Sequence, residues 1–434
     1  MGRRFWVIFC AILSIIWGGE AAFARPGANS RVEKDRKIVI FRDGTQEADR
    51  EDAVRQHGGR SRRRVALVNG LVVNIPEAAV KALLRHPKVK AVYDDVPMQA
   101  DGAITFTPVT PPAVEAYPWG QQHIGVPAAR QLLPTLLLQP VRIAVLDTGL
   151  DLTHPELQQV IVGGYNALAG ANTANYQDDN GHGSHMAGII AAAANGQGII
   201  GAMQKPRLLG VKVLDDTGAG YLSDLLNGLN WVLENNIRIV NMSLSFDEGS
   251  PLLAQAMQDL DAAGVIIVAS AGNKCKVSTG NDSGGDDSGG DDSGGDNTTT
   301  CDLSQDPLQG GVKYPARYPE AIAVAATDIN DHIATYTRTG PEVSLVAPGG
   351  SSVTGKILST ITAGQYAYGS GASQATAHVT GALGMILQLT PGLSSAQVLT
   401  LLQTTAVDLG VPATQQGAGL VNALGMVNAL LGLP

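Results

Sequence analysis

From residue 114 onward, short and almost continuous apolar runs alternate with amphipathic stretches of helical period. Apolar runs rich in β-branched residues are typical of strands in a parallel sheet that is covered on both faces. The expected strands are residues 141–146, 208–214, 237–241 and 265–269, and the expected helices are residues 185–194, 222–235, 251–263 and 375–389. This alternation predicts a doubly wound α/β fold, in which a mostly parallel sheet is flanked by helices and functional groups lie at the carboxyl ends of the strands.

A shorter pattern precedes this region, between Arg25 and about Ala100. Its expected elements are strands at 37–41 and 89–93, a hairpin made of 65–68 and 71–75 that turns at Asn69-Gly70, and helices at 46–57 and from Pro76 onward. These elements predict a small α+β domain that is separable from the larger one.

Residues 101–113 join the two domains and are rich in threonine and proline, with almost no periodic apolar pattern. Such a segment is expected to be an exposed linker. Exposed linkers are preferred sites of proteolysis, so this is where an inactive precursor would be cut; a permanent tether between the domains is the alternative. We place the small domain and its linker at residues 25–112 and the large domain at residues 113–434.

The first residues indicate the compartment. Arg3 and Arg4 precede an apolar run from Phe5 to Trp17, and Ala22-Phe23-Ala24 follows with small residues at the two positions that a signal peptidase reads. This pattern predicts a signal peptide at residues 1–24. An uncleaved membrane anchor is the alternative, but the apolar run is shorter than a bilayer span needs. The protein is therefore expected to be secreted, either outside the cell or into a periplasm, and to keep no membrane segment.

Composition narrows the class of protein. The chain has 434 residues, a formal net charge of -9 and a pI near 5.4, which argues against nucleic-acid binding. Its hydrophobic content of 44% and charged content of 16%, with 52 glycines, suit a loop-rich globular enzyme rather than a disordered chain.

One segment departs from this composition. The sequence Asp282-Ser283-Gly284-Gly285-Asp286 recurs twice more, through Asp296, and contains no apolar side chain, so residues 275–301 are expected to form a surface insert. Its spacing fits neither an EF-hand loop nor a nonapeptide calcium repeat. Cys10 lies in the signal peptide, so Cys275 and Cys301 are predicted to pair in an oxidising compartment; two free thiols are the alternative.

Three motifs bring catalytic residue types to the ends of expected elements. Asp147 ends a buried strand, His182 starts a helix, and Ser373 leads into the last expected helix. A serine hydroxyl becomes a nucleophile when an imidazole takes its proton, and a carboxylate fixes the tautomer of that imidazole. Asn273 follows another buried strand, where its amide can donate to the oxyanion of a tetrahedral intermediate beside the backbone N–H of Ser373.

Each motif is weak alone, but their order along the chain is specific, and Asp, His, Ser is the order found in subtilisin. On these residues the chain resembles the subtilase family over nearly its whole length, with an inhibitory propeptide at its amino end. Further matching blocks are Val211–Leu214, Asn241–Leu244, Tyr314–Pro319, Val346–Gly349 and Gly417–Ala423.

The resemblance implies a serine endopeptidase that is made as a self-processed zymogen and hydrolyses peptide bonds through an acyl-enzyme. It implies that Asp147 orients, His182 transfers protons, Ser373 attacks and Asn273 stabilises the oxyanion. The propeptide would assist folding and occupy the cleft until it is cut. The residues expected to line the cleft, where a peptide binds as an added strand, are Gly218, Gly220, Ser243, Leu244, Ser245, Ala271 and Gly272.

The resemblance also implies structural calcium and no catalytic cofactor. Residues 193–199 resemble the calcium loop of the family, and oxygen ligands suit this ion. The expected ligands are Ala193, Asn195, Gln197 and Ile199 of the loop, with the carboxylates of Glu115 and Glu156. An ordinary surface turn is the alternative.

The chain departs from the family pattern around the nucleophile. The usual Gly-Thr-Ser-Met-Ala is Gly371-Ala372-Ser373-Gln374-Ala375, and Ala377 replaces a proline in the following helix. Gln374 places a polar group beside the nucleophile, where it can alter rate or specificity. Lys313 lies where the family commonly has a small residue, and it either favours an acidic residue before the scissile bond or points to solvent.

Two other classes of protein compete with this interpretation. Asp147-Thr148-Gly149 and Asp216-Thr217-Gly218 are two Asp-Thr-Gly motifs, as in an aspartic protease, although that enzyme needs two related β lobes. The altered serine motif also allows a non-enzymatic binding protein on a protease scaffold. The favoured hypothesis predicts protein or peptide substrates, the chain's own propeptide as an intramolecular inhibitor, and a monomer.

Overall fold

The computed structural model describes residues 35–102, 106–133, 137–274, 308–351 and 353–433. The predicted signal peptide, the Asp/Gly repeat and both Cys275 and Cys301 lie outside the described residues, so the predicted disulfide stays a prediction. Among the described helices, none has the length and apolar character needed to cross a bilayer.

The centre of the molecule is a sheet of seven strands in the order β15-β14-β13-β11-β7-β9-β8, and all its pairings are parallel. Its strands are β7 (Val141–Asp147), β8 (Ile161–Asn166), β9 (Pro206–Lys212), β11 (Ile239–Met242), β13 (Ile266–Ser270), β14 (Ala321–Thr327) and β15 (Leu345–Pro348). The predicted fold class, a mostly parallel α/β sheet flanked by helices, is confirmed.

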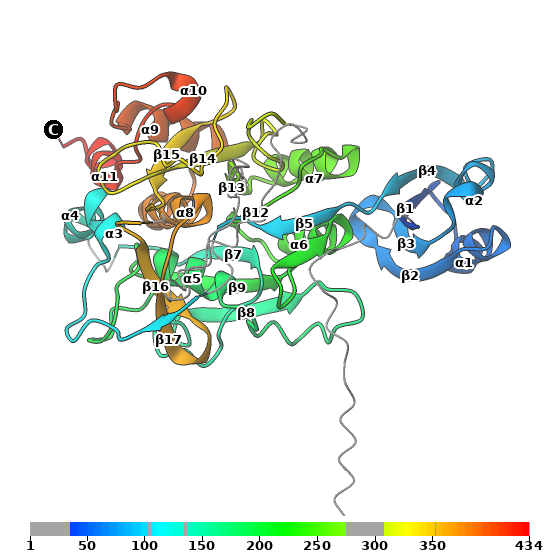
Figure 1. Cartoon of the computed structure of the whole chain (residues 1–434), viewed down its shortest axis with the longest axis horizontal. Coiled ribbons are helices and arrows are strands. Elements are labelled where there is room, and N and C mark those ends of the chain that lie inside the picture. Colours follow the sequence, from blue (N-terminus) through cyan, green and yellow to red (C-terminus); the bar gives the residue numbers. More distant parts are fainter. Residues whose placement is uncertain (1–34, 103–105, 134–136, 275–307, 352, 434) are drawn as a thin grey trace, which may run out of the picture.

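Helices cover both faces of this sheet (Figure 1). In β7, Ile143 and Val145 are buried in the apolar cluster that contains side chains of α5 (His182–Ala191) and α8 (Ala372–Leu389). Ala144 and Leu146 are buried in the cluster that contains side chains of α6 (Leu222–Glu234) and α7 (Pro251–Ala262). Burial on both faces explains why these strands read as continuous apolar runs. The remaining helices of this region are α3 (Trp119–His123), α4 (Val126–Leu132), α9 (Ser395–Thr405), α10 (Ala413–Gln416) and α11 (Ala423–Leu431).

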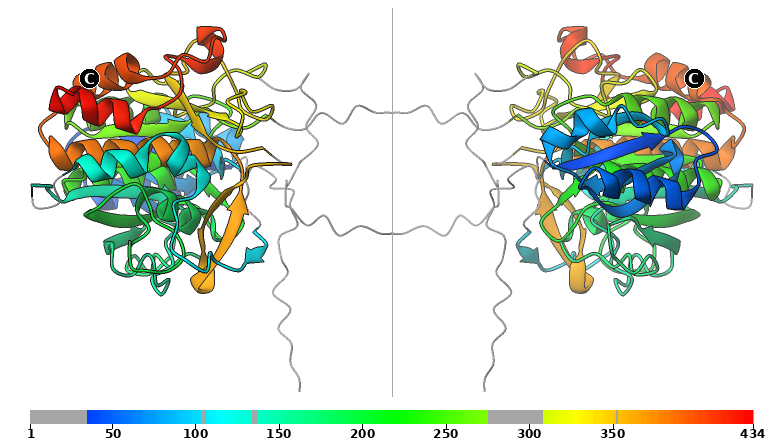
Figure 2. Two further views of the ribbon diagram at one scale, coloured as in Figure 1. Left: turned by 90° about the vertical axis from the view of Figure 1, so that its left-hand side faces the viewer. Right: turned by 90° about the vertical axis from the view of Figure 1, so that its right-hand side faces the viewer.

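A smaller antiparallel sheet with the order β2-β3-β1-β4 stands at one end of the molecule (Figures 1 and 2). Its elements are β1 (Arg36–Phe41), α1 (Glu47–Gln56), β2 (Arg60–Val65), β3 (Gly70–Asn74), α2 (Glu77–Leu83) and β4 (Val89–Asp94). Alternate residues of β1 face opposite ways: Val39 and Phe41 pack with α1 and α2, and Ile38 and Ile40 join the cluster of α6 and α7. One face of the small sheet is therefore buried against the large domain.

The predicted hairpin of this unit is shifted. Its first strand is Arg60–Val65, and residues Ala66–Val68 form a 3-10 turn instead of a strand. Three arginines at 62–64 interrupt the apolar alternation that would mark this strand in the sequence. The strand was therefore predicted at the apolar residues that follow it, 65–68. Asn69, in the left-handed conformation with φ 53°, then closes the connection.

The predicted linker, residues 101–113, contains one short strand, and a second strand lies directly before it. Residues Pro97–Ala100 form β5, the central strand of a three-stranded sheet with β10 (Ala219–Tyr221) and β12 (Leu244–Ser245). Residues Pro108–Val109 form β6, which pairs with β17 (Gln365–Gly369), the partner of β16 (Ile357–Ile361). Both ends of the segment that follows the small unit are thus held by backbone hydrogen bonds to the large domain, which a pattern of local apolarity cannot predict.

Candidate active site

Asp147 and His182 meet at the carboxyl edge of the central sheet. Asp147 is the last residue of β7 and His182 is the first residue of α5, and both side chains are fully buried. His182 Nδ1 lies 2.8 Å from Asp147 Oδ1, which also accepts a hydrogen bond of 2.8 Å from the backbone N–H of Thr148. The carboxylate therefore fixes the ring orientation and leaves Nε2 to face the cleft.

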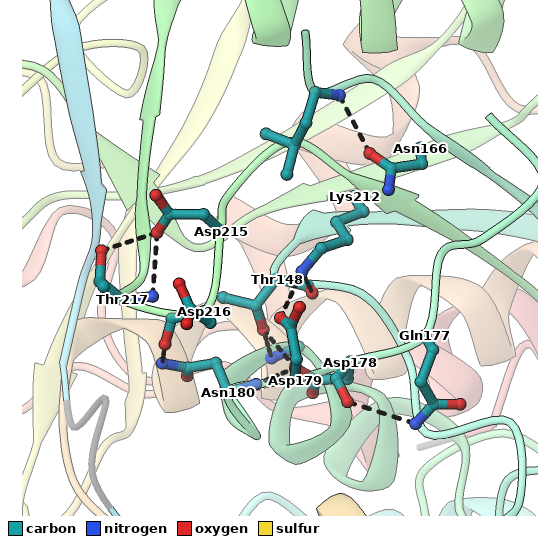
Figure 3. Close-up of polar contacts among 12 residues, drawn as sticks. Thr148, Asn166, Gln177, Asp178, Asp179, Asn180, Lys212, Asp215, Asp216 and Thr217 are labelled. Atoms are coloured by element: carbon teal, nitrogen blue, oxygen red, sulfur yellow. Dashed lines mark hydrogen bonds and ion pairs between the residues drawn. The ribbon is translucent and has the colours of Figure 1, made fainter. Parts of the chain in front are cut away.

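Asp178, which lies beside Thr148 and Asn180 (Figure 3), holds the start of α5 in place. Its Oδ1 accepts hydrogen bonds from the backbone N–H groups of Asn180 (3.0 Å) and Gly181 (2.9 Å), and its Oδ2 accepts from the backbone N–H (2.9 Å) and hydroxyl (2.6 Å) of Ser184. Thr148 Oγ1 donates to Asp178 at 2.8 Å and accepts from Gly183 N at 2.9 Å. Because a carboxylate at a helix N-terminus pairs otherwise unsatisfied donors, Asp178 ties the helix that carries His182 to the end of β7.

The second Asp-Thr-Gly motif forms a surface turn. Figure 3 shows Asp215 Oδ1 accepting from the backbone N–H (2.9 Å) and hydroxyl (2.7 Å) of Thr217. Asp216 is exposed, and its carbonyl accepts a hydrogen bond of 2.9 Å from Asn180 Nδ2. Its carboxylate is therefore not paired with buried Asp147, as the two aspartates of an aspartic protease would be.

Ser373 lies in the first turn of α8 and is fully buried. Its hydroxyl donates to the carbonyl of Ser243 at 3.4 Å, and among the hydrogen bonds of the described residues none joins it to His182. His182 Nε2 instead lies 3.1 Å from the carbonyl oxygen of Asp101. The structure thus brings Asp147 and His182 into contact and places the end of β5 against the imidazole.

The surroundings of His182 favour its charged form. Burial alone lowers the pKa of His182, but the charge and hydrogen bond of Asp147, the carbonyl of Asp101 and the charge of Asp178 raise it further than burial lowers it. The net effect is a pKa above the ordinary value for histidine, so these surroundings make the imidazole a better proton acceptor.

Asn273 lies beside the N-terminus of α8. Its side-chain carbonyl accepts a hydrogen bond of 3.1 Å from Ala372 N, and its backbone carbonyl accepts one of 3.1 Å from Arg338 Nε. These bonds orient the amide so that its N–H groups are the remaining donors. A Cβ at Gly371 would lie 3.3 Å from Asn273 Nδ2, which places this donor next to the residue that precedes Ala372 and Ser373.

The predicted cleft residues hold β5 from both sides. Ala100 N donates to the carbonyl of Gly218 at 2.9 Å, and Asp101 N donates to the carbonyl of Ser243 at 3.0 Å. Opposite residues across the two pairings are Gly220 with Met98, Leu244 with Ala100, and Ser245 with Gln99. A Cβ at Gly220 would lie 2.8 Å from Met98 Cε, so the lack of a side chain there admits this residue. These five residues therefore hold the chain's own segment around β5 as an added strand, the way in which a peptide can be held.

Ala271, Gly272 and Lys313 lie together next to this strand. Lys313 N donates to the carbonyl of Ala271 at 3.0 Å, and a Cβ at Gly272 would lie 3.0 Å from Cγ and Cδ of Lys313. Lys313 Nζ lies 2.8 Å from Asp247 Oδ1, and the lysine side chain is only 16% exposed. The side chain therefore follows the backbone of residue 272 instead of extending into solvent.

Gln374 is fully buried, and neither polar atom of its side chain has a hydrogen-bond partner among the described residues. A Cβ at Gly102 would lie 3.3 Å from Gln374 Oε1, and one at Gly369 would lie 2.8 Å from Gln374 Nε2. Gln374, which stands where the family usually has methionine, therefore lies next to Gly102, the residue that follows Asp101.

The predicted calcium loop brings its two carboxylates onto the same turn. Glu115 Oε1 accepts from the backbone N–H groups of Asn195 (2.6 Å) and Gly196 (2.8 Å). Glu156 Oε1 accepts from Ile199 N (3.1 Å) and from the Tyr366 hydroxyl (2.6 Å), and Asn195 Oδ1 accepts from Gln197 N at 3.2 Å. The carbonyl of Glu156 accepts from Ala193 N at 3.0 Å.

Glu156 is the residue of this loop that fits a cation. Its Oε2 is buried and has no hydrogen-bond partner in the part of the chain that the structure describes. Burial, with a smaller contribution from the charge of Glu115, raises the pKa of Glu156 to about 7. A buried carboxylate with an unpaired oxygen and a second carboxylate nearby suits a hard cation. Within the described ranges no group of three or more acidic, histidine or cysteine side chains gathers, so amide and carbonyl oxygens would supply the other ligands.

Sequence reasoning missed two residues of this site. Asp178 carried a weak signal, as a carboxylate that precedes a helix start, and Asp101 carried none, because the segment that contains it has no apolar pattern. Asp101 contacts His182 through its own backbone carbonyl, and the Asp178 carboxylate accepts from backbone N–H groups of α5 and the turn before it. The positions of such backbone groups follow from the fold.

Comparisons with known proteins agree with this geometry. Residues 139–426 match the model of the group described as the Subtilase family. Subtilisin E of Bacillus subtilis (strain 168) is 32% identical over 427 residues, which cover 97% of this chain and 98% of that protein. Subtilisin Savinase of Lederbergia lenta is 36% identical over 309 residues, 71% of this chain and 98% of that protein. Alkaline elastase YaB of Bacillus sp. (strain YaB) is 36% identical over 310 residues, 71% of this chain and 70% of that protein.

Proposed function

The chain belongs to the subtilase family, and from this premise we propose that it is a secreted serine endopeptidase, made as a zymogen that cuts itself. Relatives named as subtilisins and as an alkaline elastase support the activity. The predicted signal peptide, residues 1–24, supports export.

The observation that carries this proposal is the peptide in the cleft. Residues 97–101 run as the central strand between β10 and β12, and the carbonyl of Asp101 lies 3.1 Å from His182 Nε2. A peptide carbonyl held beside a buried imidazole–carboxylate pair is the arrangement of a bound substrate.

The residues of the site supply the steps of acyl transfer. Ser373 Oγ attacks the carbonyl carbon of the substrate while His182 Nε2 takes its proton, and Asp147 stabilises the imidazolium. The amide of Asn273 and the backbone N–H of Ser373 donate to the developing oxyanion. His182 then gives the proton to the leaving amine, and water hydrolyses the acyl-enzyme. No cofactor takes part in these steps.

The small amino-terminal unit supports the zymogen part of the proposal. We assign residues 25–112 to the propeptide and its linker, and residues 113–434 to the peptidase domain. Asp95 follows β4 and accepts hydrogen bonds of 2.8 Å from both the backbone N–H and the hydroxyl of Ser223, at the N-terminus of α6. The unit thereby anchors the strand that follows it, and while β5 is in the cleft no other substrate binds there.

Calcium is proposed as a structural ion at residues 193–199. Glu156 and Glu115 would supply carboxylates, and Ala193, Asn195, Gln197 and Ile199 would supply amide or carbonyl oxygens. When bound, the ion would neutralise the two carboxylates and stabilise the loop; it has no part in bond cleavage.

The test is self-cleavage of the full chain with Ser373→Ala. The unchanged chain is expected to lose its amino-terminal unit on incubation and to label with a serine-directed fluorophosphonate, because Ser373 is the attacking group. Ser373→Ala is expected to keep full length and remain unlabelled. The matched control, Ser351→Ala at an exposed turn, is expected to mature and label normally. Maturation of purified Ser373→Ala at the normal rate would contradict the proposal.

A further inference from the structure

The hydrogen bonds of β5 identify one peptide bond among those of the cleft strand. Asp101 N is bound to the carbonyl of Ser243, and Ser243 in turn accepts the hydroxyl of Ser373. The carbonyl of Asp101 is the one that His182 contacts. The carbonyl that these hydrogen bonds hold against His182 therefore belongs to Asp101, and the leaving group of its peptide bond would be the nitrogen of Gly102.

We propose that the zymogen cuts itself between Asp101 and Gly102, and that the pocket around Asp101 selects an acidic residue before the scissile bond in other substrates. The proposal rests on the proposed endopeptidase activity and names its substrate class.

Gly102 fits the leaving side of this bond. Its φ of +111° lies in the region that favours glycine. A Cβ at Gly371 would lie 2.7 Å from the Cα of Gly102, so the chain passes directly over the residue that begins the turn of Ser373. A glycine after the cut is therefore what this part of the cleft accepts.

The pocket of Asp101 is built from polar and charged groups. The residue is 5% exposed, and its Oδ1 accepts a hydrogen bond of 2.7 Å from the hydroxyl of Ser245. Its Oδ2 is buried and accepts no hydrogen bond of good geometry from the described residues. Burial raises the pKa of Asp101 above its ordinary value, and the charge of Lys313, followed by the hydroxyls of Ser245 and Ser270, offsets part of this rise.

Among the groups that lower the pKa of Asp101, Lys313 and His182 are the two cationic side chains. The side chain of Lys313 is nearly buried, whereas its partner Asp247 is 61% exposed, so solvent screens that ion pair. The unpaired Oδ2 of a buried aspartate is a better partner than an exposed one, because a buried charge attracts more strongly. An apolar residue in this pocket would leave the hydroxyl of Ser245 without its acceptor, and Lys313 would keep only the exposed carboxylate of Asp247 as a partner.

Self-cleavage replaces the peptide bond between Asp101 and Gly102 first by an ester and then by a free carboxylate. Ser373 Oγ forms an ester with the carbonyl carbon of Asp101 while the bond from that carbon to the Gly102 nitrogen breaks. The proton of the serine passes through His182 to that nitrogen, which leaves as a free amine. Water then cleaves the ester, so the propeptide ends in the carboxylate of Asp101 and Ser373 regains its hydrogen.

The first test locates the bond. The wild-type chain is allowed to mature, and the earliest new amino terminus is determined by intact mass and terminal sequencing. Gly102 is the expected first residue. A first cut anywhere else, for example within residues 106–113, would overturn the assignment of this bond.

The second test measures the pocket on the matured enzyme. The substrates are quenched fluorescent peptides of sequence Pro-Met-Gln-Ala-Xaa-Gly, in which Xaa is Asp, Asn, Leu or Lys. We expect kcat/KM for Asp to exceed that for Asn and Leu by about 10- to 100-fold, the size of charge-assisted hydrogen bonds. Lys313→Met is expected to remove the advantage of Asp over Asn. Lys205→Met, just before the amino end of β9 and thus at the edge of the sheet opposite to Asp147, is expected to retain it.

Fluorophosphonate labelling of Ser373 distinguishes a wrong pocket assignment from a wrong endopeptidase proposal. An enzyme that labels but cleaves the Leu peptide best, or keeps its preference in Lys313→Met, overturns the pocket assignment and leaves the endopeptidase proposal intact. A chain that neither labels nor cuts any peptide overturns both.

Discussion

At the scale of single residues, catalytic geometry here depends on groups that take no part in the reaction. His182 is the first residue of its helix, where backbone N–H groups lack partners within the helix. Asp178 supplies the missing acceptors and is 3% exposed, so its removal would leave buried donors unpaired. Its neighbour Asp179 contacts Lys212 and is 54% exposed.

This pair of aspartates makes a matched test. Asp178→Ala is expected to lower kcat about 100-fold, since small displacements of a catalytic group cost this much, and to lower the free energy of unfolding by about 1–3 kcal/mol. Asp179→Ala is expected to change either quantity little, because the Asp179 carboxylate is exposed to solvent and the buried Lys212 keeps its hydrogen bond to the carbonyl of Thr148. Kinetics of matured enzyme and denaturant melts measure both effects, and equal losses in the two variants would contradict the role given to Asp178.

Candidate catalytic residues were easier to name from the sequence than the residues that position them. Asp147, His182, Asn273 and Ser373 stand in short motifs of small residues at expected element ends, so residue type and spacing were enough to propose them. Asp101 reaches His182 through its backbone carbonyl, which every residue has, and no side-chain pattern marks it. For Lys313 the sequence left two options, and its position along Gly272 follows from packing that only the fold defines.

At the scale of elements, the buried strands β7, β9, β11 and β13 were predicted within a few residues. The buried strands β14 and β15, and the strands that depend on partners, were not predicted. β7, β11 and β13 are apolar because helices cover them. β5 is formed by Pro97-Met98-Gln99-Ala100, which has one large apolar side chain, and it exists because β10 and β12 pair with it. β2 is rich in arginine because part of it faces the large domain through polar contacts.

The contact between β2 and α6 is an ionic one. Arg63 donates to the Ser223 hydroxyl at 2.9 Å, to the Asp224 carboxylate and to the carbonyl of Ala167. Burial raises the pKa of Asp224 to about 6, and the charge of Arg63 opposes this rise. Arg63 therefore compensates a buried carboxylate of the large domain.

Loss of Arg63 is expected to weaken the hold of the amino-terminal unit. Charge-assisted hydrogen bonds contribute about 1.5–3 kcal/mol, so Arg63→Ala should release the cut unit roughly 10- to 100-fold faster. The lag between self-cleavage and activity on an added peptide measures this release. Arg64→Ala, on the exposed side of the same strand, should keep the normal lag. An unchanged lag in Arg63→Ala would show that other contacts hold the unit.

At the scale of the whole molecule, the loop at residues 193–199 joins segments that are distant in the chain. Glu115 follows β6, Glu156 lies between β7 and β8, and Tyr366 belongs to β17. Both glutamates accept hydrogen bonds from backbone N–H groups of this loop, and the Tyr366 hydroxyl donates to Glu156. One ion bound there would therefore link several parts of the fold at once, and its binding free energy would add to the stability of the folded state alone.

Calcium is therefore expected to raise the melting temperature of the matured enzyme. An ion at 100 times its Kd stabilises by about 2.7 kcal/mol, which corresponds to roughly 4 °C for a domain of this size. The measurement is calorimetry of the active-site-blocked enzyme in calcium and in chelator. Glu156→Gln is expected to lose the difference between the two conditions, because it removes the buried unpaired oxygen as a charged ligand. Glu248→Gln, at an exposed position, should keep it. A calcium response of normal size in Glu156→Gln would place the ion elsewhere in the molecule.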